Sequence, residues 1–599
     1  MASHSRLGLT TPERTPGPEN QIFLNLKELE AWLSSLPMAN IGETSRQVFK
    51  AIVEMNRREI PYTKRAQTAE LLRQPVSYIC KNLRKYFYDL PLPLSARNQK
   101  VSVLCRELHS ELATSYKIII EELLNDSDRR PDKQLLTTAL HHAIFYLSRV
   151  LYYSAIVYNP YPGLVWKEIH LLYRYANQLQ LAEAPIKDAL NAKTETSTLS
   201  NLYRRIMLFG IASPYSLRQR EIEYLVSNLP DWTPHIKVSA CKQQDQNKQA
   251  TGFLVQTSND EPPVHAAFVT MPITGGCLQI DTQSLAPFLR ERLKQLDTEA
   301  GISGMQVSDV QVAQSLLQKY IQTLGAAPDR TFVRTTLNLE LEVAIGLAAI
   351  HALIIENLAA KTDTMDEVDE TEESQIVEKI TLSLSPMEQQ FDEAGYAPNT
   401  ASGTWLQDQS APTWTQDSQE KNYTTIPCKT FNESAGGYCI DLSGTDIKGI
   451  RVGELIGIQS STKRAHFSIG VTRWIRNTPA LGLQIGIEMI ALDAGAVFVH
   501  PLDRRDDAQA SQSALLLPQQ KISKQPGSLI VQPFTHRTND VLWVTVAGEQ
   551  KQVRLLHLLE TTGAFARFRY QPLDSAIQPG QSQKKTNPSQ EFDNIWEEL

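Results

Sequence analysis

The residues whose types and spacing could do chemistry lie in one short stretch, "TFNESAGGYCIDL", at positions 430–442. Asn432, Ser434 and Gly437 follow the pattern N-x-S-x-x-G, with apolar alternation on either side. In a strand, residues two apart point to the same face, so Asn432 and Ser434 would project together, while Gly437 would leave room for something flat. This set suits the edge of a planar ligand such as a nucleobase. A tight turn capped by Asn and Ser explains the same residues and stays open.

A pair of arginines forms the second candidate. Arg330 and Arg334, in "PDRTFVRTTLNLELEV", supply the one R-x-x-x-R spacing of the chain. Guanidinium groups clamp phosphates bidentately and stack on flat rings, which lysine cannot do. Chance alone would give about one or two such spacings in a chain of this size. The context is more specific, because the pair follows a Pro-Asp turn and leads directly into an alternating strand.

Other chemistry is not indicated. The sequence holds no G-x-x-x-x-G-K-S/T, H-E-x-x-H or G-x-S-x-G, so we expect a protein that is not an enzyme and has no cofactor. His141 and His142 stand in an apolar helical run, where neighbours point about 100° apart, so we expect core residues and not a metal site. The six cysteines are scattered, which indicates neither a zinc site nor a disulfide frame.

Length and charge bound the class of protein. A chain of 599 residues exceeds the size of a single core, so several domains are expected. The net charge of −7 and the lack of a basic stripe argue against DNA or RNA as partners. No run of eighteen apolar residues occurs, so we expect no transmembrane segment and a cytoplasmic protein.

The elements that position these residues follow from periodicity and composition. Apolar residues recur at three and four in the N-terminal part, alternation begins near Pro234, and two segments have tail or linker composition. The expected divisions are a tail at 1–22, a helical domain at 23–233, an α+β region at 234–360, an acidic and Ser/Thr/Pro-rich linker or insertion at 361–421, a β-barrel with extra strands at 422–572, and a tail at 573–599.

The barrel region resembles the PilZ domain of bacterial proteins. The opening N-x-S-x-x-G-G is followed by the strands "GELIGI", "IGVTRW" and "LQIGIEMI", which is the order found in that family, and the resemblance covers Tyr423 to Val499. It implies a six-stranded barrel and cyclic di-GMP as ligand. Members that bind the nucleotide carry R-x-x-x-R just before the first strand, yet no arginine precedes Asn432 at that distance.

We therefore expect a split PilZ domain. Residues 330–346 would form the arginine loop and first strand, a helix and the acidic segment would be inserted, and the barrel would resume at Tyr423. Long surface insertions add little closure entropy. The fold class expected is multidomain α+β: an N-terminal all-α helical bundle, a middle α+β region and a C-terminal PilZ-like antiparallel β-barrel. Surface charges without a ligand explain Arg330 and Arg334 as well.

The resemblance also implies roles for the individual residues. Arg330 and Arg334 would engage phosphate and guanine, Asn432 and Ser434 the guanine edges, and Gly437 would keep the floor open. Arg473, beside Trp474, is a weaker candidate for a further phosphate or stacking contact, and an exposed strand residue is the simpler explanation.

The function expected is a non-enzymatic cyclic di-GMP effector that relays the messenger to an unidentified protein partner, in type IV pilus function, flagellar motility or biofilm control. The alternative is a degenerate PilZ-like scaffold that mediates protein contacts without nucleotide. The last residues, "EFDNIWEEL", place Phe592, Ile595, Trp596 and Leu599 on one helical face. Such a stripe docks into a partner's groove or folds back on its own chain.

Overall fold

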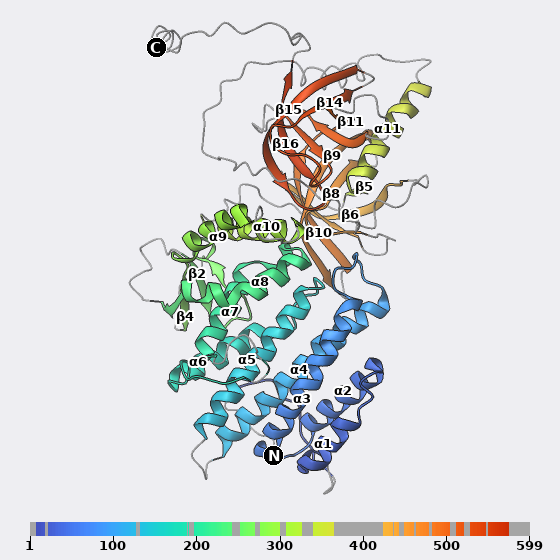
Figure 1. The fold of residues 1–599 in the computed structure, drawn as a ribbon. Coiled ribbons are helices and arrows are strands. Elements are labelled where there is room, and N and C mark those ends of the chain that lie inside the picture. Colours follow the sequence, from blue (N-terminus) through green and yellow to red (C-terminus); the bar gives the residue numbers. More distant parts are fainter. Residues whose placement is uncertain are drawn as a thin grey trace, which may run out of the picture. The chain divides into compact units, whose positions relative to one another are not determined.

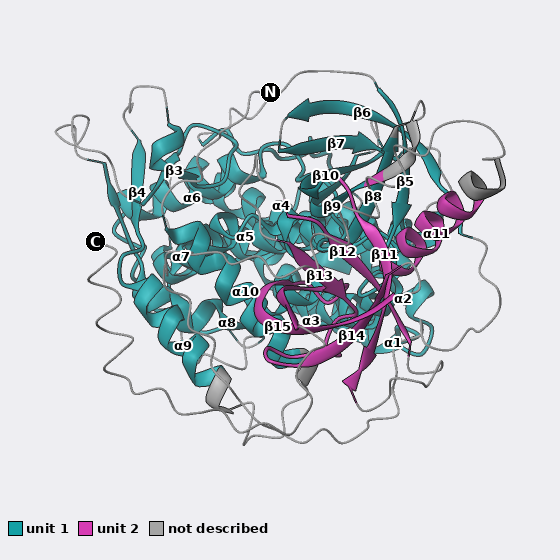
Figure 2. Ribbon diagram, turned by 90° about the horizontal axis from the view of Figure 1, so that it is seen from above, with its two compact units in different colours: residues 1–346, 397–464, 468–492 teal, residues 347–396, 465–467, 493–599 magenta. Residues whose placement is uncertain are grey.

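The structure is a computed structural model, and it divides the chain into two compact units (Figure 2). Unit 1 holds residues 1–346, 397–464 and 468–492, and unit 2 holds the rest. The described residues are 7–17, 22–126, 132–188, 190, 197–241, 252–269, 276–299, 307–325, 339–364, 423–434, 436–442, 449–460, 463–478, 482–502, 511–519, 527–546 and 549–573.

The N-terminal part of unit 1 consists of helices, as the 3.6-residue periodicity predicts (Figure 1). They are η1 (Ile22–Leu24), α1 (Leu26–Ser35), α2 (Ile41–Arg57), α3 (Tyr62–Leu83), η2 (Arg84–Tyr86), α4 (Ala96–Asn125), α5 (Lys133–Ala155), α6 (Val165–Gln178), α7 (Leu199–Ile211), η3 (Pro214–Ser216), α8 (Gln219–Trp232) and η4 (Thr233–His235). Side-chain caps begin several of them. The Asn40 side chain accepts a hydrogen bond from the Glu43 N–H at 3.2 Å, which satisfies a free donor of the first turn.

A small α+β layer follows in the same unit. Its elements are β1 (Lys237–Ala240), β2 (Phe253–Gln256), β3 (Val264–His265), η6 (Ala266–Phe268), β4 (Cys277–Asp281), α9 (Leu285–Glu299) and α10 (Val307–Leu324). The strands form an antiparallel sheet in the order β1-β4-β2-β3. Phe253, Ile280, Leu289 and Tyr320 belong to one hydrophobic core with the helices, so the layer is built onto the helical bundle.

A closed barrel completes unit 1. Its strands are β5 (Glu340–Ile345), β6 (Ile426–Ser434), β7 (Gly437–Asp441), β8 (Leu455–Ser460), β9 (Lys463–Thr478) and β10 (Gly482–Ala491), in the order β10-β7-β6-β5-β8-β9. β5 pairs antiparallel with β6 and with β8, although it precedes the acidic segment in the chain. The split of the barrel that the alternating "LNLELEV" predicted is therefore confirmed.

Unit 2 holds a second closed barrel. Its strands are β11 (Gly495–Pro501), β12 (Gln512–Leu517), β13 (Ser528–Val531), β14 (Val541–Val546), β15 (Glu549–Thr561) and β16 (Ala566–Leu573), and α11 (Leu347–Thr364) packs on β11 and β12. His351 Nε2 lies 3.1 Å from the Val497 carbonyl oxygen. The sequence interpretation of one barrel with extra strands differs from this result, because β11 closes onto β14 and not onto the first barrel.

The structure describes part of the expected N-terminal tail, little of the expected linker and almost none of the expected C-terminal tail. Of the tail expected at 1–22, residues 7–17 lie on the helices: Leu9 is buried, and the Thr10 N–H donates to Glu168 at 2.7 Å. Residues 365–422 and 574–599, which include most of the predicted linker and the predicted C-terminal stripe, lie outside the described residues. Among the described residues, no helix has both the length and the apolar character needed to cross a membrane.

Candidate functional site

The hairpin of β6 and β7 holds three of the predicted site residues. Ser434 pairs with Gly437 across the turn, and the Ser434 hydroxyl donates to the Gly437 carbonyl oxygen at 3.3 Å. Asn432 pairs with Cys439 beyond a register shift, and both Asn432 and Ser434 are half-buried. Within the described part of the chain, nothing bonds the Asn432 side chain.

Gly437 has a structural reason of its own. A Cβ at this position would lie 1.9 Å from the Ile487 carbonyl oxygen, on the neighbouring strand β10. Glycine is required here because β7 and β10 approach closely, a use that strands often make of this residue. The resemblance implies a second role for Gly437, which is to leave space for the ligand, and this role stays a prediction.

Arg473 lies on β9 at a register shift, next to the hairpin end of the barrel. Its Nε donates to Glu488, which pairs with Gly437 across β7 and β10. Arg473 is about one-third exposed. Strand register brings Arg473 to Glu488 although they are fifteen positions apart, a pairing that no short pattern in the sequence indicates. A phosphate at Arg473 would have to compete with this carboxylate.

Arg330 and Arg334 lie outside the described residues, but the strand that follows them is well placed. Thr430 on β6 holds Leu339, the residue before β5, through two hydrogen bonds: the Thr430 N–H donates to the Leu339 carbonyl oxygen at 3.0 Å, and the Leu339 N–H donates to Thr430 Oγ1 at 2.9 Å. Asn432 is two residues beyond Thr430. Even a fully extended chain spans only about 3.6 Å per residue, so Arg334 is restricted to about 18 Å from Leu339.

Glu454 gives the barrel a titrating group. It precedes β8, and its carboxylate lies 3.6 Å from the place of a Cβ on Gly346, whose N–H donates to the Leu455 carbonyl oxygen at 2.9 Å. Burial raises the pKa of Glu454 to about 7, although Arg451 and the Leu455 N–H act in the opposite direction. The folded chain therefore holds a proton near neutral pH that the unfolded chain releases.

We expect Glu454→Gln to stabilise the first barrel at pH 8 and not at pH 4. Between the ordinary pKa of 4.5 and the folded value of about 7, only the folded state is protonated, so rising pH lowers stability through this window. Above it, the substitution should gain up to about 3 kcal/mol. Hydrogen exchange of barrel amides at both pH values measures the difference. An equal gain at pH 4 would assign the effect to packing of the glutamine.

The helical region contains a buried polar cluster around two histidines. His141, His142 and Asp188 each offer a ligand atom within 4.8 Å of the others, and the two Nδ1 atoms lie 3.2 Å apart. The expectation that adjacent helical residues cannot face one point was wrong, because side-chain rotation closes the angle between them. The expected core position is confirmed, since His141 and His142 are 3% and 1% exposed.

A guanidinium group occupies the centre of this cluster. Arg73 Nη2 donates to Asp188 at 2.6 Å, and Arg73 Nη1 lies 2.9 Å from His142 Nε2. A cation therefore already neutralises the only carboxylate of the three-residue set. Burial lowers the pKa of His141 to about 3, and His142 adds to the effect. The cluster is a packed ion-pair network of the helical region.

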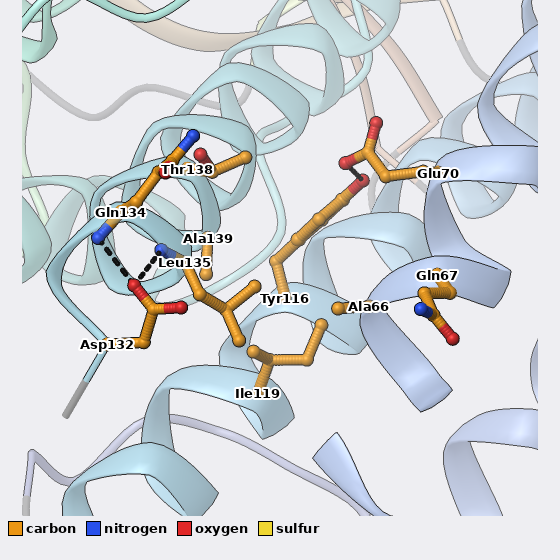
Figure 3. A pocket seen from close by; sticks show the side chains of 10 residues that line it. All are labelled: Ala66, Gln67, Glu70, Tyr116, Ile119, Asp132, Gln134, Leu135, Thr138 and Ala139. Carbon is orange, nitrogen blue, oxygen red and sulfur yellow. Dashed lines mark hydrogen bonds between the residues drawn. The ribbon is translucent and has the colours of Figure 1, made fainter. Parts of the chain in front are cut away.

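A cavity of about 280 Å³ lies beside this network, between α3, α4 and α5 (Figure 3). Its two carboxylates and its tyrosine hydroxyl are already engaged. The Tyr116 hydroxyl donates to Glu70 at 2.6 Å, and Asp132 accepts from the N–H groups of Gln134 and Leu135 at 2.9 and 3.2 Å. The hairpin of the first barrel remains the candidate site, because β6, the strand of Asn432 and Ser434, pairs with β5, the strand that follows the R-x-x-x-R segment in the chain.

Comparison with known proteins identifies the domains of the chain. Three family models match: the N-terminal domain of the cyclic-di-GMP receptor FimW at residues 27–244, its middle PilZ domain at 252–495, and the FimW C-terminal β-barrel domain at 497–573. Together they span most of the chain, which therefore belongs to the PilZ-domain protein family. The middle match includes both β5 and the strands after the insertion.

A particular relative is similar over its whole length. The chain is 28% identical to the cyclic-di-GMP receptor FimW of Pseudomonas aeruginosa, and the match covers 99% of each protein. No solved structure matches the chain.

Proposed function

We propose that this chain is a non-enzymatic receptor that binds cyclic di-GMP at the hairpin end of the first barrel. The observation that carries the proposal is the pairing of β5 with β6, because it joins the strand after the R-x-x-x-R segment to the strand of Asn432 and Ser434. The relative named as a cyclic-di-GMP receptor supports the choice of ligand.

The roles we assign follow the chemistry of the nucleotide. Arg330 and Arg334 clamp phosphate and stack on guanine, because planar guanidinium groups do both. Asn432 and Ser434 hydrogen-bond to guanine edges. Arg473 contributes a weaker contact, since it must first leave Glu488.

The downstream role we propose is relay to a protein partner that controls type IV pilus function, flagellar motility or biofilm formation. The family resemblance supports this role, and nothing in the site selects among the three processes. A PilZ-like scaffold without nucleotide is the competing function. One observation favours this scaffold function: close packing of the strands is by itself enough to explain the glycine at position 437.

Calorimetric titration of the full chain with cyclic di-GMP tests the proposal. We expect the unaltered protein to bind and Arg334→Ala to lose at least about a hundredfold in affinity, the loss that follows when a charged hydrogen-bonding group is removed from a phosphate. Arg554→Ala is the matched control, because Arg554 is an exposed arginine on β15 in the second barrel. We expect its affinity to equal that of the unaltered chain.

Two results would contradict the proposal. No heat of binding from the unaltered chain would leave the scaffold as the function. Equal losses in Arg334→Ala and Arg554→Ala would show a general effect of charge, without a specific arginine contact.

A further inference from the structure

The hydrophobic core of the first barrel contains two side chains from the helical region. Leu92 follows η2, Tyr158 follows α5, and each is only 3% exposed. They share one cluster with barrel residues that include Leu442, Ile450 and Ile475. The helical region therefore supplies part of the apolar packing on which the barrel depends.

Backbone hydrogen bonds hold the same two residues to the barrel. The Gly449 N–H donates to the Leu92 carbonyl oxygen at 3.2 Å, and Leu92 forms an antiparallel bridge with Ile450. The Asn477 N–H donates to the Tyr158 carbonyl oxygen at 2.8 Å. Both hydrogen bonds form only with the helical region in place, so they add to the apolar contacts of the same two residues.

The helical side holds Tyr158 firmly. Its hydroxyl donates to the Leu217 carbonyl oxygen at 2.8 Å in a buried position. The backbone at Tyr158 has φ of 56°, a left-handed conformation that a bulky residue adopts only where its surroundings enforce it. Nearby, the Tyr215 hydroxyl donates to the Asn159 carbonyl oxygen at 2.7 Å, and the Arg476 guanidinium lies 5.8 Å from the Tyr215 ring centre.

These contacts lie at the end of the strands opposite to the hairpin. On β7, Gly437 at the hairpin end pairs with Glu488, whereas Asp441 at the other end pairs with Gln484. Leu442 and Leu483, which follow and precede that second pair, belong to the cluster with Leu92 and Tyr158. The same short strands therefore run from the proposed ligand site to the helical region.

We propose that Leu92 and Tyr158 couple the barrel to the two helical loops that carry them, so that a ligand at the hairpin stabilises these loops as well as the barrel. The ligand part rests on the function proposed above. A ligand that binds only the folded state suppresses every opening that destroys its site, and at one hundred times its dissociation constant the suppression is about a hundredfold. Amides that open together with the barrel share this factor.

Hydrogen exchange on the full chain tests the coupling first without ligand. Leu92→Ala should raise the exchange of β7, β9 and β10 amides at least about tenfold, because loss of a core leucine weakens every opening that exposes it. Leu29→Ala is the matched control: Leu29 is fully buried on α1 and is not part of the cluster that contains Leu92 and Tyr158, so we expect faster exchange in α1 and unchanged exchange in the barrel. Barrel exchange that stays unchanged in Leu92→Ala overturns the proposal.

Cyclic di-GMP at one hundred times its dissociation constant gives the second arm. We expect the unaltered chain to show about a hundredfold slower exchange both in the barrel and in peptides that contain Leu92 and Tyr158. Protection of the barrel without these loops overturns the transmission. No protection anywhere overturns the proposed function instead, and the ligand-free arm then decides the coupling by itself.

Discussion

Arg73→Met should destabilise the helical region by about 3–5 kcal/mol, the range found when one partner of a buried ion pair is removed. Arg73 is 4% exposed and donates to Asp188 at 2.6 Å, to Glu70 at 2.8 Å and to the Tyr146 hydroxyl at 2.9 Å. Methionine keeps the apolar stem and removes the charge. The Asp188 carboxylate, 3% exposed, is then left without its counter-ion.

Urea unfolding followed by helical circular dichroism measures this loss, because most of the helices, α1 to α8, lie in the N-terminal part of unit 1. Arg46→Met is the control: its guanidinium pairs with Glu43 but is 77% exposed, so little change is expected. The double substitution Arg73→Met with Asp188→Leu should recover much of the loss, since it removes both charges. A single substitution that costs under about 1 kcal/mol, with no recovery in the double, would contradict the argument.

Gly437→Ala should destabilise the first barrel by about 3 kcal/mol, at the upper end of ordinary overpacking. The new Cβ would meet the Ile487 carbonyl oxygen at 1.9 Å and the Glu488 Cα at 3.2 Å. Both are backbone atoms, so neither can turn away as a side chain could. Strands β7 and β10 would have to separate. Faster hydrogen exchange of β7 and β10 amides measures the effect.

Two other glycines serve as controls. Gly163→Ala has no atom within 4 Å of the added Cβ and should change stability little. Gly486→Ala meets the Trp474 indole, a side chain that can move, so an intermediate effect is expected. If Gly437→Ala instead kept the barrel intact and abolished only nucleotide binding, the open-floor role of Gly437 would be supported over the packing role.

Local patterns in the sequence predicted much of this architecture. The 3.6-residue spacing gave the helices, and the alternation of "LNLELEV" identified β5 before the insertion. Short offsets also singled out Asn432, Ser434 and Gly437, which lie together on one hairpin, and their contact with a nucleotide stays a prediction. The helices, β5 and the hairpin motif all depend on neighbours within a few positions, where propensity and periodicity determine the structure.

Features that depend on distant pairing were not predictable. The closure of β11 onto β14 separates the second barrel, and no short stretch records it. Leu92 and Tyr158 stand in "PLPLS" and "YNPYPG", which correctly read as helix breaks, but a remote barrel decides where their side chains are buried. The approach of His141 to His142 depends on rotamers and on Arg73, which periodicity does not describe.

The long separation in the chain between β5 and its partner strands also affects how the protein folds during synthesis. Residues 340–345 leave the ribosome before β6 and β8, between which they must pair. Translation at about 5–20 residues per second separates β5 from β6 by several seconds, which is long compared with hairpin formation. During this interval both edges of the nascent strand are open to other chains, so co-translational mispairing is a hazard. A barrel without the insertion between β5 and β6 would avoid it.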